Sequence, residues 1–133
     1  MTTSPTAAAR KHKILVIDDE TIILQVLTLH LRSADYDVVC AGSACDGINL
    51  LPSASFSLVI TDYHLPDKNG LAVLSAVKSS KPDTPVIVIS GFLDADLIAG
   101  ILNAGAARYL KKPFLKTELL DSVAHILNAG QDA

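Results

Sequence analysis

Apolar residues gather along the chain in short runs that alternate with longer amphipathic segments. Five runs are short and mostly apolar, as in strands buried between two layers, and they cover residues 13–17, 36–41, 56–61, 86–90 and 107–111. After each run, apolar positions recur with helical spacing, which predicts helices from residue 20 onward and over 43–51, 71–78, 94–103 and 116–128. Because strands and helices alternate, the pattern predicts a parallel sheet with helices on both faces.

The alternation also restricts the topology. Right-handed crossovers favour a flavodoxin-like, doubly wound α/β fold with five parallel strands in the order 2-1-3-4-5 and five helices. We expect a disordered N-terminal tail over residues 1–12, one folded domain over 13–128 and a C-terminal tail over 129–133. The sequence leaves open whether this is a single-domain protein or a piece of a longer one.

Glycine and serine give the predicted helices their ends. Ser43 is a candidate N-cap, and Gly105 is well placed to end the fourth helix. Gly100 lies inside that helix, where glycine costs about 0.5–1 kcal/mol relative to alanine. We therefore predict that the fourth helix is less stable than its neighbours.

Composition excludes several classes of protein. The net charge of −3 gives no support for direct binding of nucleic acid. No apolar run approaches the roughly 20 residues that span a membrane, and the first residues lack the apolar segment of a secretion signal. We expect a cytoplasmic protein whose Cys40 and Cys45 are free, buried or half-buried thiols.

Polar side chains stand where four of the predicted strands end. The first strand is followed by Asp18 and Asp19, the third by Asp62, the fourth ends at Ser90, and the fifth is followed by Lys112. These ends meet at one edge of an open parallel sheet, where ligands bind in such folds. Converging carboxylates repel one another unless a cation joins them.

The donor types at this edge suggest the cation. No thiolate is expected there, and His64 is the only nearby imidazole. Oxygen ligands favour Mg²⁺, with Mn²⁺ as an alternative. A hydroxyl from Ser90 and an ammonium from Lys112 suit the oxygens of a transferred phosphoryl group. Since a carboxylate can itself be the nucleophile, these residues predict Mg²⁺-dependent phosphorylation of Asp62.

At this point the chain resembles a known family, the receiver domain of two-component response regulators, and in particular the chemotaxis regulators. The resemblance covers about Lys13 to Leu127. It is carried by four motifs in order: Asp18-Asp19, Asp62-x-x-Leu65-Pro66-x-x-x-Gly70, Ser90-Gly91, and the run from Gly105 to Lys112-Pro113-Phe114.

The resemblance implies a role for each metal-site residue. Asp62 would accept a phosphoryl group from a sensor histidine kinase or a histidine phosphotransfer protein. Asp19, Asp62 and the backbone carbonyl of His64 would hold Mg²⁺ directly, and Asp18 would act through water. Lys112 would contact the phosphoryl group. Such a domain is a signalling phosphoprotein, which catalyses only its own phosphorylation and dephosphorylation.

The resemblance also implies a switch. Ser90 would move toward phosphorylated Asp62, and Tyr109 would turn inward with it. The face made by the fourth helix, fifth strand and last helix would then change its affinity for a downstream protein, an effector domain or a second copy of the chain. The peptide bond of Lys112–Pro113 is expected to be cis, as it often is in the family.

Two side chains are expected to tune the lifetime of the phosphoryl group. His64 lies two residues after the acceptor, where a side chain can border the path of the hydrolytic water. Phe92, on the neighbouring loop, would act with it. We hypothesise that the pair sets the rate of dephosphorylation.

Structural roles and other functions were alternatives at this point. Asp18 or Asp19 could also cap the following helix, and Tyr109 could simply pack. A haloacid-dehalogenase-like phosphohydrolase also uses Asp and Mg²⁺, but it needs a second acid two residues after its nucleophile, where this chain has His64. A receiver-like scaffold that is not phosphorylated would not need all of the site residues. A flavin-binding protein of this fold would need a hydroxyl-rich loop after the first strand.

Overall fold

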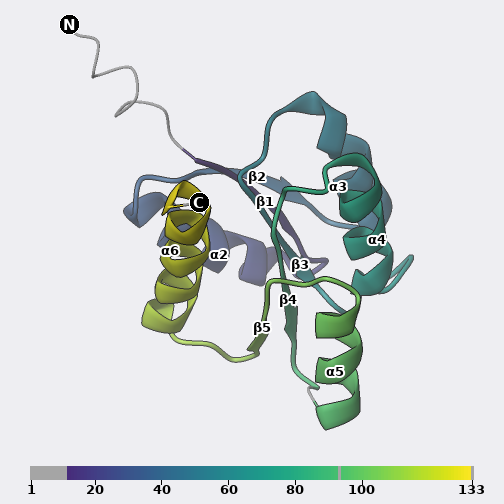
Figure 1. The fold of residues 1–133 in the computed structure, drawn as a ribbon. Helices are drawn as coiled ribbons and strands as arrows, with labels where there is room; N and C mark the ends of the chain where they lie inside the picture. Colours follow the sequence, from purple (N-terminus) through teal and green to yellow (C-terminus); the bar gives the residue numbers. More distant parts are fainter. Residues whose placement is uncertain (1–11, 93, 133) are drawn as a thin grey trace, which may run out of the picture.

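The computed structural model describes residues 12–92 and 94–132 (Figure 1). Strands and helices alternate along the chain, as the apolar pattern predicts. The strands are β1 (Lys13–Ile17), β2 (Asp37–Ala41), β3 (Leu58–Asp62), β4 (Val86–Ser90) and β5 (Arg108–Lys111). The helices are α2 (Thr21–Ser33), α3 (Ala44–Leu50), the 3-10 turn η1 (Leu51–Ser53), α4 (Gly70–Ser80), α5 (Ala95–Asn103) and α6 (Lys116–Asp132).

The five strands form one parallel sheet in the order β2-β1-β3-β4-β5, which confirms the predicted fold and strand order. The register pairs Ile17 with Thr61, Asp62 with Ile89, and Ser90 with Lys111. The residues at the carboxyl ends of β1, β3, β4 and β5 are therefore neighbours at one edge of the sheet.

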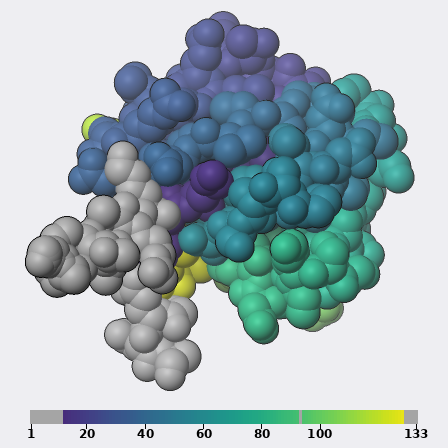
Figure 2. Space-filling model, turned by 90° about the horizontal axis from the view of Figure 1, so that it is seen from above, coloured from purple at the N-terminus to yellow at the C-terminus, as the bar shows by residue number. Residues whose placement is uncertain are grey.

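Helices cover both faces of the sheet (Figure 1). One core packs under α3, α4 and α5 and includes Leu15, Val59 and Val88. The other packs under α2 and α6 and includes Val16, Ile60 and Ile89. Because successive residues of a strand point to opposite faces, central strands buried on both sides consist almost entirely of apolar residues. In space filling, the segments of α3 and α4 lie side by side on one face (Figure 2).

Several helix ends agree with the turn chemistry of the sequence. Ser43 is the N-cap of α3 and accepts a hydrogen bond from the backbone N–H of Asp46. Asn69 and Asp94 cap α4 and α5 in the same way. Gly105 has a φ of 106°, which explains why glycine follows α5.

Some boundaries and surface features differ from the predictions. Helix α6 continues to Asp132 instead of ending at Asn128. Neither Asp18 nor Asp19 is the N-cap of α2, since that position is Glu20, which makes no side-chain cap. Cys40 and Cys45 are free thiols but are exposed instead of buried. The predicted N-terminal tail lies outside the described residues except for His12.

Among the described residues, no helix is both long enough and apolar enough to cross a membrane.

Candidate functional site

Of the predicted site residues, Asp18 and Asp62 meet the Lys112 ammonium at the carboxyl edge of the sheet, whereas Asp19 does not contact it among the described ion pairs. The ammonium Nζ lies 2.9 Å from Oδ2 of Asp18 and 3.3 Å from Oδ2 of Asp62. It also lies 3.2 Å from Oε1 of Glu20. Lys112 comes from the loop after β5, so the topology joins residues that are far apart in the sequence.

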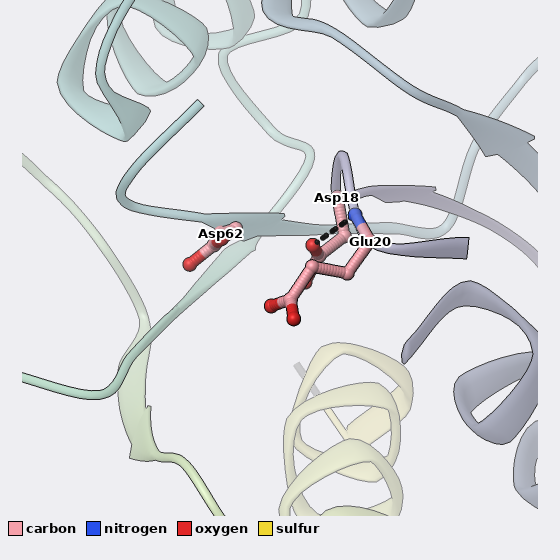
Figure 3. A group of neighbouring side chains, drawn as sticks. All are labelled: Asp18, Glu20 and Asp62. Atoms are coloured by element: carbon pink, nitrogen blue, oxygen red, sulfur yellow. Dashed lines mark hydrogen bonds between the residues drawn. The ribbon is translucent and has the colours of Figure 1, made fainter. Parts of the chain in front are cut away.

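Three carboxylates form a compact group beside this lysine. One side-chain oxygen each of Asp18, Glu20 and Asp62 lies within 4.8 Å of the other two. Figure 3 shows the three neighbouring side chains. Asp18 and Asp62 are 1% and 6% exposed, whereas the carboxylate of Glu20 reaches in from solvent. One oxygen of Asp18 also accepts a hydrogen bond from the backbone N–H of Glu20. Such a set of oxygen donors fits a hard divalent cation.

Glu20 was not among the predicted site residues. The acidic run Asp18-Asp19-Glu20 contains a signal for it, but the apolar pattern indicates only that a helix begins near Glu20. It enters the site because the backbone turns between β1 and α2, and this turn brings its side chain back toward the strand end (Figure 3).

A cavity of about 290 Å³ opens over the carboxylates. It is lined by Asp19, Glu20, Asp62, His64, Gly91, Phe92 and Lys112. Asp19 is exposed and faces this cavity, whereas Asp18 is buried beneath it against Lys112. A small anionic group could enter and reach both Asp62 and Lys112.

Electrostatics distinguish the two central groups. Burial raises the pKa of Asp62, the nearby charge of Asp18 raises it further, and Lys112 acts in the opposite direction. Burial alone would lower the pKa of Lys112, but its hydrogen bond to Asp18 and the charge of Asp62 outweigh this and raise the pKa to about 12. The site therefore concentrates negative charge around one permanent cation, which favours binding of a second cation.

The two predicted switch residues do not point at Asp62 in this structure. Ser90 is buried, and its hydroxyl exchanges hydrogen bonds with the backbone of Phe92, donating at 3.2 Å and accepting at 3.0 Å. Tyr109 lies on β5 with its side chain 38% exposed. The structure thus shows Ser90, at the end of β4, bonded to the loop that follows it, and Tyr109 turned outward.

His64 and Phe92 stand together at the edge of the cavity. Their ring centroids are 6.0 Å apart with an edge-to-face geometry, and both residues are exposed. The two loops that follow β3 and β4 therefore meet at the cavity through these side chains. The Lys112–Pro113 peptide bond is cis, as predicted.

Comparison with known proteins identifies the family. The family model of the response regulator receiver domain matches residues 14–124. The transcriptional regulatory protein PmrA of Pectobacterium parmentieri is 36% identical over 119 residues, which are 90% of this chain and 54% of that protein. The cell cycle response regulator CtrA of Brucella ovis is 31% identical over 119 residues, again 90% of this chain and 51% of that protein. The chain thus spans about half the length of these relatives.

Solved structures of receiver domains are similar to this chain as well. A CheY-like receiver domain protein from Methanospirillum hungatei JF-1 superimposes with a TM-score of 0.88 at 28% identity, over 92% of this chain and 98% of that one. The signal receiver domain of an HD domain-containing protein from Pseudomonas fluorescens Pf-5 gives 0.87 at 34% identity, over 93% and 100%. With the matched family model and the acidic strand-end site, these likenesses show that the chain belongs to the response regulator receiver domains of two-component systems.

Proposed function

We propose that this receiver domain is phosphorylated on Asp62 in a Mg²⁺-dependent reaction with a phosphohistidine donor. The observation that supports this most directly is the position of Lys112, whose ammonium bonds both Asp18 and Asp62 beneath an open cavity. Asp62 combines the three properties that an acceptor needs: it ends a strand, it faces the cavity, and it stands beside a cation.

The donor set fits a magnesium ion. Asp19, Asp62 and the backbone carbonyl of His64 would hold it directly, with Asp18 acting through water. Glu20 adds a further oxygen next to Asp18 and Asp62. When bound, Mg²⁺ supplies positive charge for the phosphoryl oxygens and offsets the repulsion among the carboxylates.

The reaction itself is a simple displacement. An oxygen of Asp62 forms a bond to phosphorus, the phosphorus–nitrogen bond of the phosphohistidine breaks, and the imidazole leaves with the electron pair. Lys112 contacts the phosphoryl oxygens and neutralises part of their charge. His64 and Phe92 border the cavity and limit the approach of the water that later hydrolyses the acyl phosphate.

The product is read out as a conformational switch. For Ser90 to reach the phosphoryl group, its hydroxyl gives up the two hydrogen bonds to Phe92. Tyr109 then turns inward from its exposed position. The face of α5, β5 and α6 changes, and with it the affinity for a downstream protein, an effector domain or a second copy. On α5, Ile101 belongs to the core, whereas Leu102 is exposed and available to that face.

The proposed donor is a sensor histidine kinase or a histidine phosphotransfer protein in the cytoplasm. Nothing in the charge balance supports direct contact of this chain with nucleic acid, and the segment matched in the transcriptional regulatory protein PmrA covers only 54% of that protein. DNA binding, where it occurs, would then belong to another domain.

Mass spectrometry tests the proposal. Incubation with a small-molecule phosphodonor and Mg²⁺ should add one phosphoryl group to the wild-type chain and none to Asp62→Asn. Chelation of Mg²⁺ should abolish the addition. An equal mass increase in Asp62→Asn would contradict the assignment, and sustained turnover of a free phosphate ester would favour a phosphohydrolase instead.

A further inference from the structure

The loop between β3 and α4 carries the His64 carbonyl. Backbone hydrogen bonds hold the two ends of this loop in place. Tyr63 donates its N–H to the carbonyl of Ile89 at 2.8 Å, and Gly70 donates to the carbonyl of Tyr63 at 2.7 Å. A Cβ at Gly70 would lie 2.9 Å from the carbonyl oxygen of Asp62, so only glycine allows this close approach. The two ends of the loop are therefore held directly beside the acceptor.

The tip of the loop is fixed by one side chain. The carboxylate of Asp67 reaches across to the first turn of α3 and accepts two backbone hydrogen bonds. Oδ1 accepts from Ala44 at 3.0 Å, and Oδ2 accepts from Cys45 at 2.8 Å. Ser43 caps the same helix from its own side through the N–H of Asp46. The first turn of α3 is thus capped by the preceding residue, Ser43, and by Asp67 from the loop between β3 and α4 (the acceptor loop).

The charges support a permanent contact. The backbone N–H of Cys45 and its thiol, both donating to the carboxylate, lower the pKa of Asp67 to about 2. The same contact and the charge of Asp67 raise the pKa of the Cys45 thiol. Asp67 is therefore ionised at neutral pH, and each of its two carboxylate oxygens accepts a backbone hydrogen bond although the residue is exposed.

We propose that Asp67 is a positioning residue for the cation site, because it joins the acceptor loop to α3 and thereby holds the His64 carbonyl in place. This inference rests on the proposed function. His64 lies between Tyr63, at the held end of the loop, and Asp67 at its tip, and it pairs across the loop with Asn69. If the tip is released, the segment from His64 to Asn69 gains freedom, and ordering it again must accompany cation binding.

Calorimetric titration of the full chain with Mg²⁺ alone tests the inference. Outer contacts of metal ligands change affinity by about tenfold or more when removed, and we expect Asp67→Ala to weaken Mg²⁺ binding by about that factor. Ser43→Ala is the matched control, because it weakens the cap of the same helix without touching the loop. We expect it to leave the Mg²⁺ dissociation constant within about twofold of wild type.

A second variant separates position from charge. Asp67→Asn removes the same charge as Asp67→Ala, but its amide oxygen can still accept one of the two backbone hydrogen bonds. We expect it to bind Mg²⁺ more tightly than Asp67→Ala and less tightly than wild type.

Three results would overturn the inference while leaving the proposed function intact. They are unchanged binding in Asp67→Ala, equal losses in Asp67→Ala and Asp67→Asn, or an equal loss in Ser43→Ala. A wild-type chain that does not bind Mg²⁺ would instead contradict the proposed function, and the inference with it.

Discussion

At the scale of single residues, Lys112 joins three carboxylates of the site. Its ammonium pairs with Asp18, Glu20 and Asp62 and offsets only part of their negative charge, and in the proposed reaction it would also contact the phosphoryl group. We predict that Lys112→Ala slows phosphorylation by about 10²–10³-fold, as when one preorganised donor is removed from a transition state. The same variant should bind Mg²⁺ more tightly, because the carboxylates lose their internal cation.

Lys111 provides the control for this pair of measurements. It is the preceding residue and is exposed on β5. Lys111→Ala should change neither the phosphorylation rate nor Mg²⁺ affinity by more than about twofold, the range of surface charge effects. Equal phosphorylation rates and equal Mg²⁺ affinities in Lys111→Ala and Lys112→Ala would contradict a specific role of Lys112 in the site.

His64 and Phe92 give a second prediction at this scale. Their rings meet at the mouth of the cavity, where, under the proposed function, they would restrict the approach of the hydrolytic water. We expect His64→Ala to shorten the lifetime of phosphorylated Asp62 severalfold, with a smaller effect on the rate of its formation. Mass spectrometry measures this lifetime as the decay of the phosphorylated chain after removal of the donor. An unchanged decay rate would contradict the prediction.

At the scale of elements, α5 tests how well local sequence predicts local stability. A Cβ at Gly100 would meet no atom within 4 Å, so alanine fits there and should stabilise the domain by about 0.5–1 kcal/mol. Gly105→Ala should destabilise it, because the φ of 106° is strained for alanine. Chemical denaturation measures both differences. Hydrogen exchange should show α5 less protected than α2.

Gly47, in the short helix α3, has no room for a larger side chain, in contrast to Gly100. It packs against Ile17 so closely that a Cβ there would overlap the Ile17 side chain, which is itself only 1% exposed. We predict that Gly47→Ala costs about 1–3 kcal/mol of stability by overpacking. A denaturation midpoint equal to that of wild type would mean that Ile17 adopts another rotamer without cost.

The elements also show what the sequence can and cannot predict. Strands were recognisable because burial on both faces makes them continuously apolar, and β4 was predicted with its observed bounds. Asp18, Asp62 and Lys112 were recognisable because the fold brings strand ends together. Glu20 and Asp67 were missed, since their roles depend on the path of a loop. A local pattern of residues does not specify which distant N–H groups a loop carboxylate will reach.

At the scale of the whole molecule, binding of a cation to the acidic edge should stabilise the fold. A ligand that binds only the native state adds about 1.4 kcal/mol of stability at ten times its dissociation constant. We therefore expect Mg²⁺ to raise the unfolding midpoint of the wild-type chain. Thermal unfolding of Asp62→Asn with and without Mg²⁺ provides the control, because this variant lacks one ligand and should respond less.

The pH dependence of stability follows from opposite shifts at two aspartates. The folded pKa of Asp62 is raised, so its contribution to stability is present at low pH and is lost as the pH rises through that pKa. The folded pKa of Asp67 is lowered to about 2, so its contribution is present at neutral pH and is lost as the pH falls toward that value.

Two asparagine variants separate these effects when unfolding is measured without Mg²⁺. Asp62→Asn should raise the unfolding midpoint above wild type at pH 7, with the difference fading toward pH 3, because a neutral side chain avoids burying a charge beside Asp18. Asp67→Asn should lower the midpoint at pH 7 and converge on wild type in acid. If Asp62→Asn were instead destabilising at pH 7, the Lys112 ion pair would outweigh the cost of burial, and the site would hold its charges without need of a metal.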